Sequence, residues 1–213
     1  MSRGLLIVLL VAPVVALAVL AARRGGLAGL SRVRLRGTAW VLLAAAVQAL
    51  RSSDPGWTDA ASPWWPLVLA CCAVGFAWAN GRVASTGVRV ALGTFAAGVL
   101  ANAVTTAVNG GMPFSVSGAR LAGLSEAAIA SPAPGHVPIA DGTRLVALAD
   151  VLPVPGLHVV LSVGDLLLWA GLVGLLVAAA AATSRLPGRA AGAHHHPVDD
   201  SGVFVHALER TSP

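Results

Sequence analysis

The sequence contains no lysine and no tyrosine, and its only cysteines are the adjacent pair Cys71 and Cys72. Neighbouring residues on a helix point in different directions, so this pair argues against an internal disulfide and favours two small apolar core residues. Charged residues make up 11% of the 213 residues, well below the share of about 25% that is usual in soluble domains. This scarcity argues against an ordinary water-soluble fold.

The sequence also lacks the motifs of several common enzyme classes. It contains no glycine-rich phosphate loop, no H-E-x-x-H zinc motif and no G-x-S-x-G nucleophile turn. We therefore predict no catalytic residue, no bound metal and no cofactor. Whether the protein is an enzyme stays open at this point, and the absence of motifs favours that it is not.

The basic residues are all arginine, 14 in number, and they give the chain a net charge of +5. In a soluble protein such a charge would indicate nucleic-acid binding. Here the arginines flank long apolar runs, which is typical of residues that orient a membrane protein. We therefore expect the protein to interact with a lipid bilayer and not with nucleic acid.

Apolar residues are what the chain has in abundance, at 56% of the sequence with a mean hydropathy of +0.80. The clearest apolar run is 163–182, whose single charge, Asp165, lies in the first turn. A helix of about 20 residues extends about 30 Å, the thickness of the hydrocarbon core of a bilayer. The sequence therefore predicts an integral membrane protein, and the alanine- and arginine-rich composition favours the plasma membrane of a bacterium with a GC-rich genome.

Five apolar runs are predicted to be transmembrane helices, which gives an all-α membrane bundle. The predicted spans are residues 4–22, 37–50, 65–80, 88–108 and 163–182. They form one predicted domain, residues 1–185, which a flexible cytoplasmic tail, 186–213, follows.

The first two spans need a further argument. The run 4–22 is longer than the usual core of a signal peptide, and Arg23 and Arg24 follow it in place of a cleavage site, so we predict a retained helix. The run 37–50 is short and carries Gln48, so whether it crosses the bilayer completely stays open.

The distribution of arginine predicts the orientation, because cytoplasmic segments of membrane proteins are enriched in basic residues. With the N-terminus outside and the C-terminus inside, ten arginines lie inside and four outside. The inner set is Arg23, Arg24, Arg32, Arg34, Arg36, Arg82, Arg89, Arg185, Arg189 and Arg210, and the outer set is Arg3, Arg51, Arg120 and Arg144.

The longest predicted connection, residues 109–161, lies outside and joins the fourth and fifth spans. Its first residues, Asn-Gly-Gly at 109–111, favour the left-handed backbone that ends a helix, and Pro113 prevents the helix from continuing. Residues 117–130 predict a short amphipathic helix, and 145–151 a second one. The loop is therefore expected to be partly helical and to pack against the bundle.

Several short blocks of the chain resemble a known family. They are an arginine-rich first loop ending in Leu35-Arg36-Gly37, NGGMP at 109–113, TRL at 143–145, DVLPVPG at 150–156 and SVGDLLL at 162–168. Together they resemble the bacterial domain-of-unknown-function family DUF5317, whose members are small integral membrane proteins. The resemblance extends from the first span to the fifth. It implies a membrane fold and brings no catalytic residues, because the family has no assigned activity.

Small and polar residues recur on one face of the fourth span: Thr94, Gly98, Asn102, Thr106 and Asn109. Such a stripe is typical of helix packing in membranes, where small side chains let two backbones approach and amides hydrogen-bond across. The alternative is a solute or ion path lined by Asn102 and Asn109. A path needs polar groups on several spans, and only Gln48 supplies one from another span, so packing is favoured.

Asp165 also has two interpretations. An acidic residue in a membrane span is by default a functional candidate. However, Ser162 and Asp165 fit the S-x-x-D pattern of a helix start, in which the carboxylate binds the backbone amide of the serine. We favour a cap made by Ser162 and Asp165, and keep an ion or proton role as the alternative.

The outer loop carries further polar residues. We expect Arg144 and Asp150 to form an ion pair that holds the loop down, and these two complete a candidate polar site with Asn102, Asn109 and Asp165. His136 and His158 lie in the same loop. Their spacing resembles no metal motif, so we predict no metal site there.

Three function classes follow. The favoured one is a structural or interaction component of the cell membrane, which partners another membrane protein or a second copy of this chain. The second is transport or sensing of a small solute or ion at the outer ends of the fourth and fifth spans. The third is an enzyme acting at the outer face on a lipid-linked substrate, with Asp150 and His136 or His158 as acid and base. Convergence of Asn109, Asp150 and Asp165 on a cavity would favour the second or third class over the first.

Overall fold

A computed structural model describes residues 35–52, 64–82 and 84–181 of the chain. The predicted first span, 4–22, and the predicted tail, 186–213, lie outside these residues. So does nearly all of the arginine-rich first loop.

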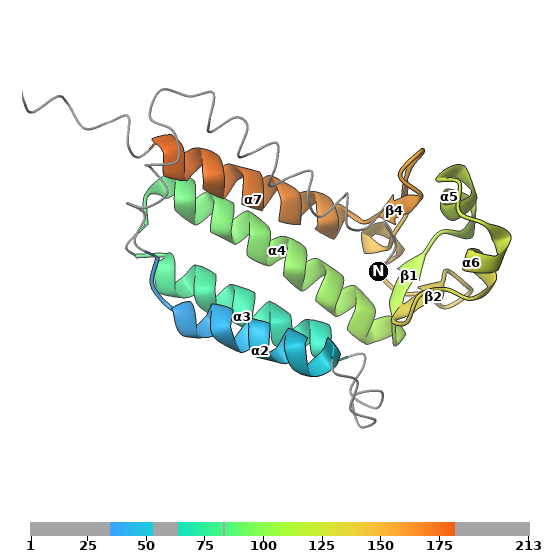
Figure 1. The fold of residues 1–213 in the computed structure, drawn as a ribbon, viewed down its shortest axis with the longest axis horizontal. Helices are drawn as coiled ribbons and strands as arrows, with labels where there is room; N and C mark the ends of the chain where they lie inside the picture. The colour runs from blue at the N-terminus through green and yellow to red at the C-terminus, as the bar shows by residue number, and fades with distance from the viewer. Residues whose placement is uncertain (1–34, 53–63, 83, 182–213) are drawn as a thin grey trace, which may run out of the picture.

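The described part is mostly helical, as predicted. Its four longer helices are α2 (Thr38–Ser52), α3 (Trp65–Asn80), α4 (Thr86–Asn109) and α7 (Val163–Ala181). Figure 1 shows them in the order α2, α3, α4, α7, each lying along the next. Their ends fall close to those of the last four predicted spans, and the bounds of α3 are those predicted.

Only α4, with 24 residues, is both long and apolar enough to cross a membrane among the helices that the structure describes. The other three long helices are apolar but shorter by this criterion. The described structure thus establishes the helical fold, and a bundle of five spans remains a proposal to which we return below.

The two ends of α4 follow from its sequence. Ser85 precedes the helix, and its hydroxyl accepts a hydrogen bond from the Val88 backbone N–H at 3.4 Å. At the other end Gly110 adopts a left-handed backbone with φ of 72°. The helix end predicted from the Asn-Gly-Gly sequence is therefore confirmed.

Glycines bring α4 and α7 into backbone contact. A Cβ atom added to Gly98 would lie 2.5 Å from the Gly164 carbonyl oxygen and 2.6 Å from the Leu168 nitrogen. Seven residues beyond Gly164, about two turns along α7, a Cβ atom added to Gly171 would overlap the Phe95 backbone. This close approach supports the packing interpretation of the small residues on the fourth span.

The side chain of Asn80 links the end of α3 to the residues that precede α2. Asn80, the last residue of α3, is fully buried, and its side-chain amide makes two hydrogen bonds with the Arg36 backbone. Its Oδ1 accepts from the Arg36 N–H at 2.8 Å and its Nδ2 donates to the Arg36 carbonyl at 2.9 Å. Nδ2 also donates to the Phe76 carbonyl within α3. The end of α3 is thereby fixed to the residues that precede α2.

The segment between α4 and α7 contains four short strands that the sequence did not predict. Strand β1 (Met112–Phe114) pairs in parallel with β2 (His136–Pro138), and β3 (Leu152–Val154) pairs antiparallel with β4 (Val159–Leu161). An isolated bridge joins Phe114 to Asp150. Figure 1 shows the segment gathered at one end of the helices.

The helices predicted for this segment are shorter than expected. The helix predicted over 117–130 is broken into α5 (Val116–Leu121) and α6 (Glu126–Ala130). Gly123 lies between them with φ of 85°, a left-handed backbone that an α-helix cannot contain. The second predicted helix, over 145–151, is only the 3₁₀ turn η2 (Val146–Leu148).

Candidate functional site

The first turn of α7 contains the cap that the sequence favoured. The Ser162 backbone N–H donates to Asp165 Oδ2 at 2.9 Å, and the Asp165 N–H donates to Ser162 Oγ at 3.0 Å. These two reciprocal bonds form a capping box and satisfy backbone donors that the start of a helix leaves free. Ser162 is fully buried, whereas Asp165 is half-buried.

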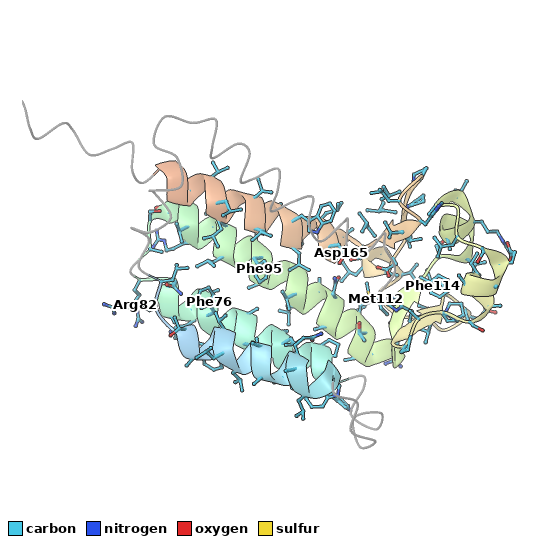
Figure 2. All side chains as sticks on the ribbon, viewed as in Figure 1. Phe76, Arg82, Phe95, Met112, Phe114 and Asp165 are labelled. Atoms are coloured by element: carbon cyan, nitrogen blue, oxygen red, sulfur yellow. The ribbon has the colours of Figure 1, made fainter. Side chains whose placement is uncertain are left out.

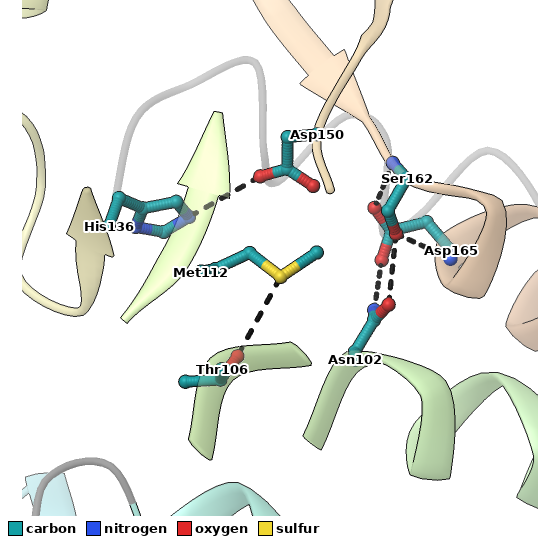
Figure 3. A network of polar contacts seen from close by, with 7 residues as sticks. All are labelled: Asn102, Thr106, Met112, His136, Asp150, Ser162 and Asp165. Carbon is teal, nitrogen blue, oxygen red and sulfur yellow. Dashed lines mark hydrogen bonds and ion pairs between the residues drawn. The ribbon is translucent and has the colours of Figure 1, made fainter. Parts of the chain in front are cut away.

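Asn102 of α4 extends this cap into a network between two helices (Figure 3). Its Nδ2 donates to Asp165 Oδ1 at 2.8 Å, and its Oδ1 accepts from the Ser162 hydroxyl at 2.9 Å. Gly164, whose place next to Asn102 leaves no room for a Cβ atom, allows the approach. The predicted site residues Asn102 and Asp165 are thus in direct contact.

Asn109 and Arg144 are also in contact, through the backbone of the arginine. Asn109 Oδ1 accepts from the Arg144 N–H at 2.8 Å, and its Nδ2 donates to the Arg144 carbonyl at 2.9 Å. The same Nδ2 donates to the Thr105 carbonyl. This repeats, at the end of α4, the arrangement that Asn80 makes at the end of α3. Asn109 therefore anchors to the bundle the segment between α4 and α7, which we call the outer segment after the predicted topology.

The backbone of Asp150 is hydrogen-bonded to strand β1 and to Ser115, the residue that precedes α5. Its N–H donates to the Pro113 carbonyl at 2.8 Å, and its carbonyl accepts from the Ser115 N–H at 2.8 Å. These bonds fix the Asp150 backbone, and 10% of the surface of its side chain is exposed.

The predicted ion pair between Arg144 and Asp150 is wrong. The Arg144 side chain is exposed, because its backbone is drawn toward Asn109 at the surface. The basic group that faces Asp150 is the His136 ring, whose Nε2 lies 3.8 Å from Asp150 Oδ2. That separation is too long for a hydrogen bond, so within the described part of the chain the Asp150 carboxyl accepts none.

The environment of Asp150 changes its acidity. Burial among apolar groups, and secondarily the negative charge of Asp165, raise the pKa of Asp150 to about 7. The carboxyl is therefore expected to exchange its proton near neutral pH, which a solvent-exposed aspartate does not do.

These groups line a cavity of about 500 Å³. It lies where α3, α4 and the start of α7 meet the outer segment. The polar residues on its wall are Asn102, Thr106, His136, Asp150 and Asp165, and the larger apolar ones include Leu69, Met112, Phe114, Leu161, Leu168 and Trp169. A cavity of this size with a few convergent polar groups is typical of a small-molecule site. We call it the outer cavity.

The candidate residues from the sequence divide into two groups. Asn102, Asp150 and Asp165 line the outer cavity, whereas Asn109 and Arg144 border a separate and more open hollow. His158 does not line the outer cavity, and its ring nitrogen lies 3.3 Å from the Ala122 carbonyl oxygen. Only part of the predicted polar site therefore lines this cavity.

Sequence reasoning missed several residues of the cavity wall. Met112 and Thr106 are in contact through a hydrogen bond from the threonine hydroxyl to the sulfur, at 3.6 Å. Phe114 and Trp169 lie on the wall as well. Met112 and Phe114 reach it through the pairing of β1 with β2, a contact between residues 24 apart for which the sequence gives no local signal.

The wall offers little for holding a metal ion. Among the residues that the structure describes, no group of three or more histidine, cysteine, aspartate or glutamate side chains is placed to coordinate one. The cavity offers instead an apolar body with one polar region made by two carboxyls and an imidazole.

Comparison with known proteins identifies the family. No curated protein and no solved structure matches the chain. The sequence model of a family described as a family of unknown function (DUF5317) matches residues 33–177, which is more than half of the chain. The matched region contains every residue of the outer cavity. The protein therefore belongs to the DUF5317 family.

Proposed function

We propose that the protein is a multi-pass protein of the bacterial cell membrane that binds a small molecule in the outer cavity, for transport or sensing. The single observation that carries this proposal is the Asp150 carboxyl, which is nine-tenths buried on the cavity wall and accepts no hydrogen bond within the described chain. A largely buried carboxyl that accepts no hydrogen bond is costly, and a ligand that donates one lowers that cost.

Two observations support the membrane part of the proposal. The four long helices are apolar, and large side chains such as Leu42, Trp78 and Val90 are exposed on them, as expected for surfaces that face lipid. In addition, Figure 2 shows Arg82 at the end of the helices opposite Phe114 and Asp165. This is the cytoplasmic end in the topology that the arginine count of the sequence favours, ten inside against four outside, which supports an outer position for the cavity.

The structural or interaction role favoured by the sequence is the second candidate. Its support is the closed hydrogen-bond network of Asn102, Ser162 and Asp165 and the glycine contacts between α4 and α7, all of which explain these residues by stability alone. It gives no role to the cavity or to the buried Asp150 carboxyl, which accepts no hydrogen bond within the described residues. Asp150 and Asp165 converge on the cavity although Asn109 borders a separate hollow, so binding in the cavity is the better account.

Filling the cavity tests the proposal. Ala128 on α6 is exposed and lies on the cavity wall, while its neighbour Ala127 is exposed and does not. The probes are 2-phenylethylamine, 2-phenylethanol and 3-phenylpropionate, which share an aromatic body and differ in charge. We expect at least one of them to raise the melting temperature of the wild-type protein and of Ala127→Trp, and to have no effect on Ala128→Trp, because stabilisation by a ligand requires binding to the folded state.

The measurement is thermal unfolding of purified protein in detergent micelles over a range of probe concentrations. If none of the probes stabilised the wild-type protein, or if Ala128→Trp responded as Ala127→Trp does, binding in the outer cavity would be the wrong function and the structural role would stand.

A further inference from the structure

We propose that the outer cavity selects organic cations, with an ammonium group held between Asp150 and Asp165 and an apolar body against Met112, Phe114 and Trp169. This inference rests on the proposed function and adds the chemical class of the ligand.

The charges on the cavity wall favour a cation. Two carboxyls, Asp150 and Asp165, lie on it, and of the described residues that line it none is an arginine. Arginine is the side chain that most often recognises anionic groups, and none of the arginines in the described residues lies on this wall. An anionic ligand would meet two like charges in apolar surroundings, which is unfavourable.

The hydrogen-bonding capacity of the two carboxyls also points to a donor-rich ligand. Asp165 accepts one bond on each oxygen, from Asn102 and from the Ser162 N–H, and each carboxylate oxygen can accept a second. Neither carboxyl oxygen of Asp150 accepts a hydrogen bond from a described residue, and His136 Nε2 lies 3.8 Å from its Oδ2. In Figure 3 the Asp150 carboxyl lies between His136 on one side and the Ser162–Asp165 turn on the other. An ammonium group, with three donors and no acceptor, complements this arrangement.

The remaining wall suits the apolar part of such a ligand. Phe114 and Trp169 present aromatic rings, which attract cations and pack against apolar groups. Met112 adds a polarizable thioether that adapts to irregular shapes. The carboxyls supply the charge recognition and these three residues the apolar contact.

Protonation of Asp150 couples binding to pH. The titratable groups that face it are His136 on β2 and Asp165 on α7, and the described residues of α3 and α4 on the wall contribute none. A cation binds the ionised carboxylate, and the pKa of Asp150 is about 7 in the empty protein. We therefore expect the affinity for an amine to fall about tenfold from pH 8 to pH 6, with the loss of the ionised form.

The experiment is isothermal titration calorimetry of the full-length protein in lipid nanodiscs at pH 8 with the same three probes. We expect 2-phenylethylamine to bind the wild-type protein at least about tenfold more tightly than 2-phenylethanol, because a hydrogen bond to a charged group is worth more than a neutral one. In Asp150→Asn this preference should disappear together with the pH dependence. Asp141→Asn, which changes an exposed aspartate outside the cavity wall, should keep both.

The outcomes separate this inference from the proposed function. If 2-phenylethanol or 3-phenylpropionate bound the wild-type protein as tightly as the amine, the cavity would bind ligands without selecting cations, and this inference would be overturned alone. Absence of binding by all three probes would overturn both. A preference for the amine that survived in Asp150→Asn would show that this carboxyl is not the selecting group.

Discussion

Asp150→Asn is expected to make the empty protein more stable at pH 8 and to remove most of the pH dependence of its stability. In the folded protein the pKa of Asp150 is about 7, against 3.8 for an exposed aspartate. The folded state therefore holds a proton that the unfolded state has lost, and the stabilisation that results is complete below pH 3.8 and lost as the pH rises to 7. A shift of this size corresponds to about 4 kcal/mol at most.

The measurement is the free energy of unfolding between pH 5 and pH 8 for the wild-type protein, Asp150→Asn and the control Asp141→Asn. The free energy of unfolding of the wild type and of the control should fall as the pH rises over this range. For Asp150→Asn it should change little with pH, and at pH 8 it should exceed that of the wild type. Measuring the free energy of unfolding of His136→Gln over the same pH range separates the contribution of His136, the basic group beside Asp150, from that of Asp150. Stability that rose with pH in the wild type would contradict the raised pKa.

Gly98→Ala is expected to destabilise the protein by about 2 to 3 kcal/mol, since the new methyl group would overlap the backbone of the neighbouring helix. The added Cβ would lie 2.5 Å from the Gly164 carbonyl oxygen. Because this is a backbone atom of α7, it cannot move out of the way by a change of side-chain rotamer. Moving α4 away from α7 would also lengthen the hydrogen bonds of Asn102, one turn further along.

Gly93→Ala is the matched control on the same helix, because a Cβ added there would meet nothing within 4 Å. Alanine favours helices over glycine, so this variant should be more stable than the wild type by about 0.5 to 1 kcal/mol. Melting temperatures in detergent micelles should therefore move in opposite directions for the two variants. Equal shifts would show that α4 and α7 do not pack through their glycines.

Much of the helical fold could be predicted from the sequence, because the signals are local. The apolar run 65–80 coincides with α3, and the Ser162–Asp165 pattern predicts both hydrogen bonds of the α7 cap. The Asn-Gly-Gly sequence after α4 predicts the helix end at Gly110. In each case the physical cause lies within a few residues of the feature, which is what a single sequence can reveal.

The site could be predicted only in part, because its contacts join distant segments. The predicted pairing of Arg144 with Asp150 rests on their opposite charges and their nearness in sequence. In the structure the Arg144 backbone is hydrogen-bonded to the Asn109 side chain, and His136 lies beside Asp150. The meeting of His136 and Asp150 depends on short strands whose three residues are too few for an alternating pattern. The cavity itself has no sequence signal, since its wall combines residues from seven elements and the turns between them.

The accessibility of Ala128 in intact cells tests most directly whether the cavity opens at the outer face. The experiment places a single cysteine at position 128, in a protein whose Cys71 and Cys72 are replaced by alanine, and measures its modification by a membrane-impermeant maleimide. The control places the cysteine at the exposed Arg82, at the opposite end of the helices. We predict rapid modification of Ala128→Cys in intact cells and modification of Arg82→Cys only after the membrane is opened. The reverse pattern would place the cavity on the cytoplasmic side and contradict the proposed function at the outer face.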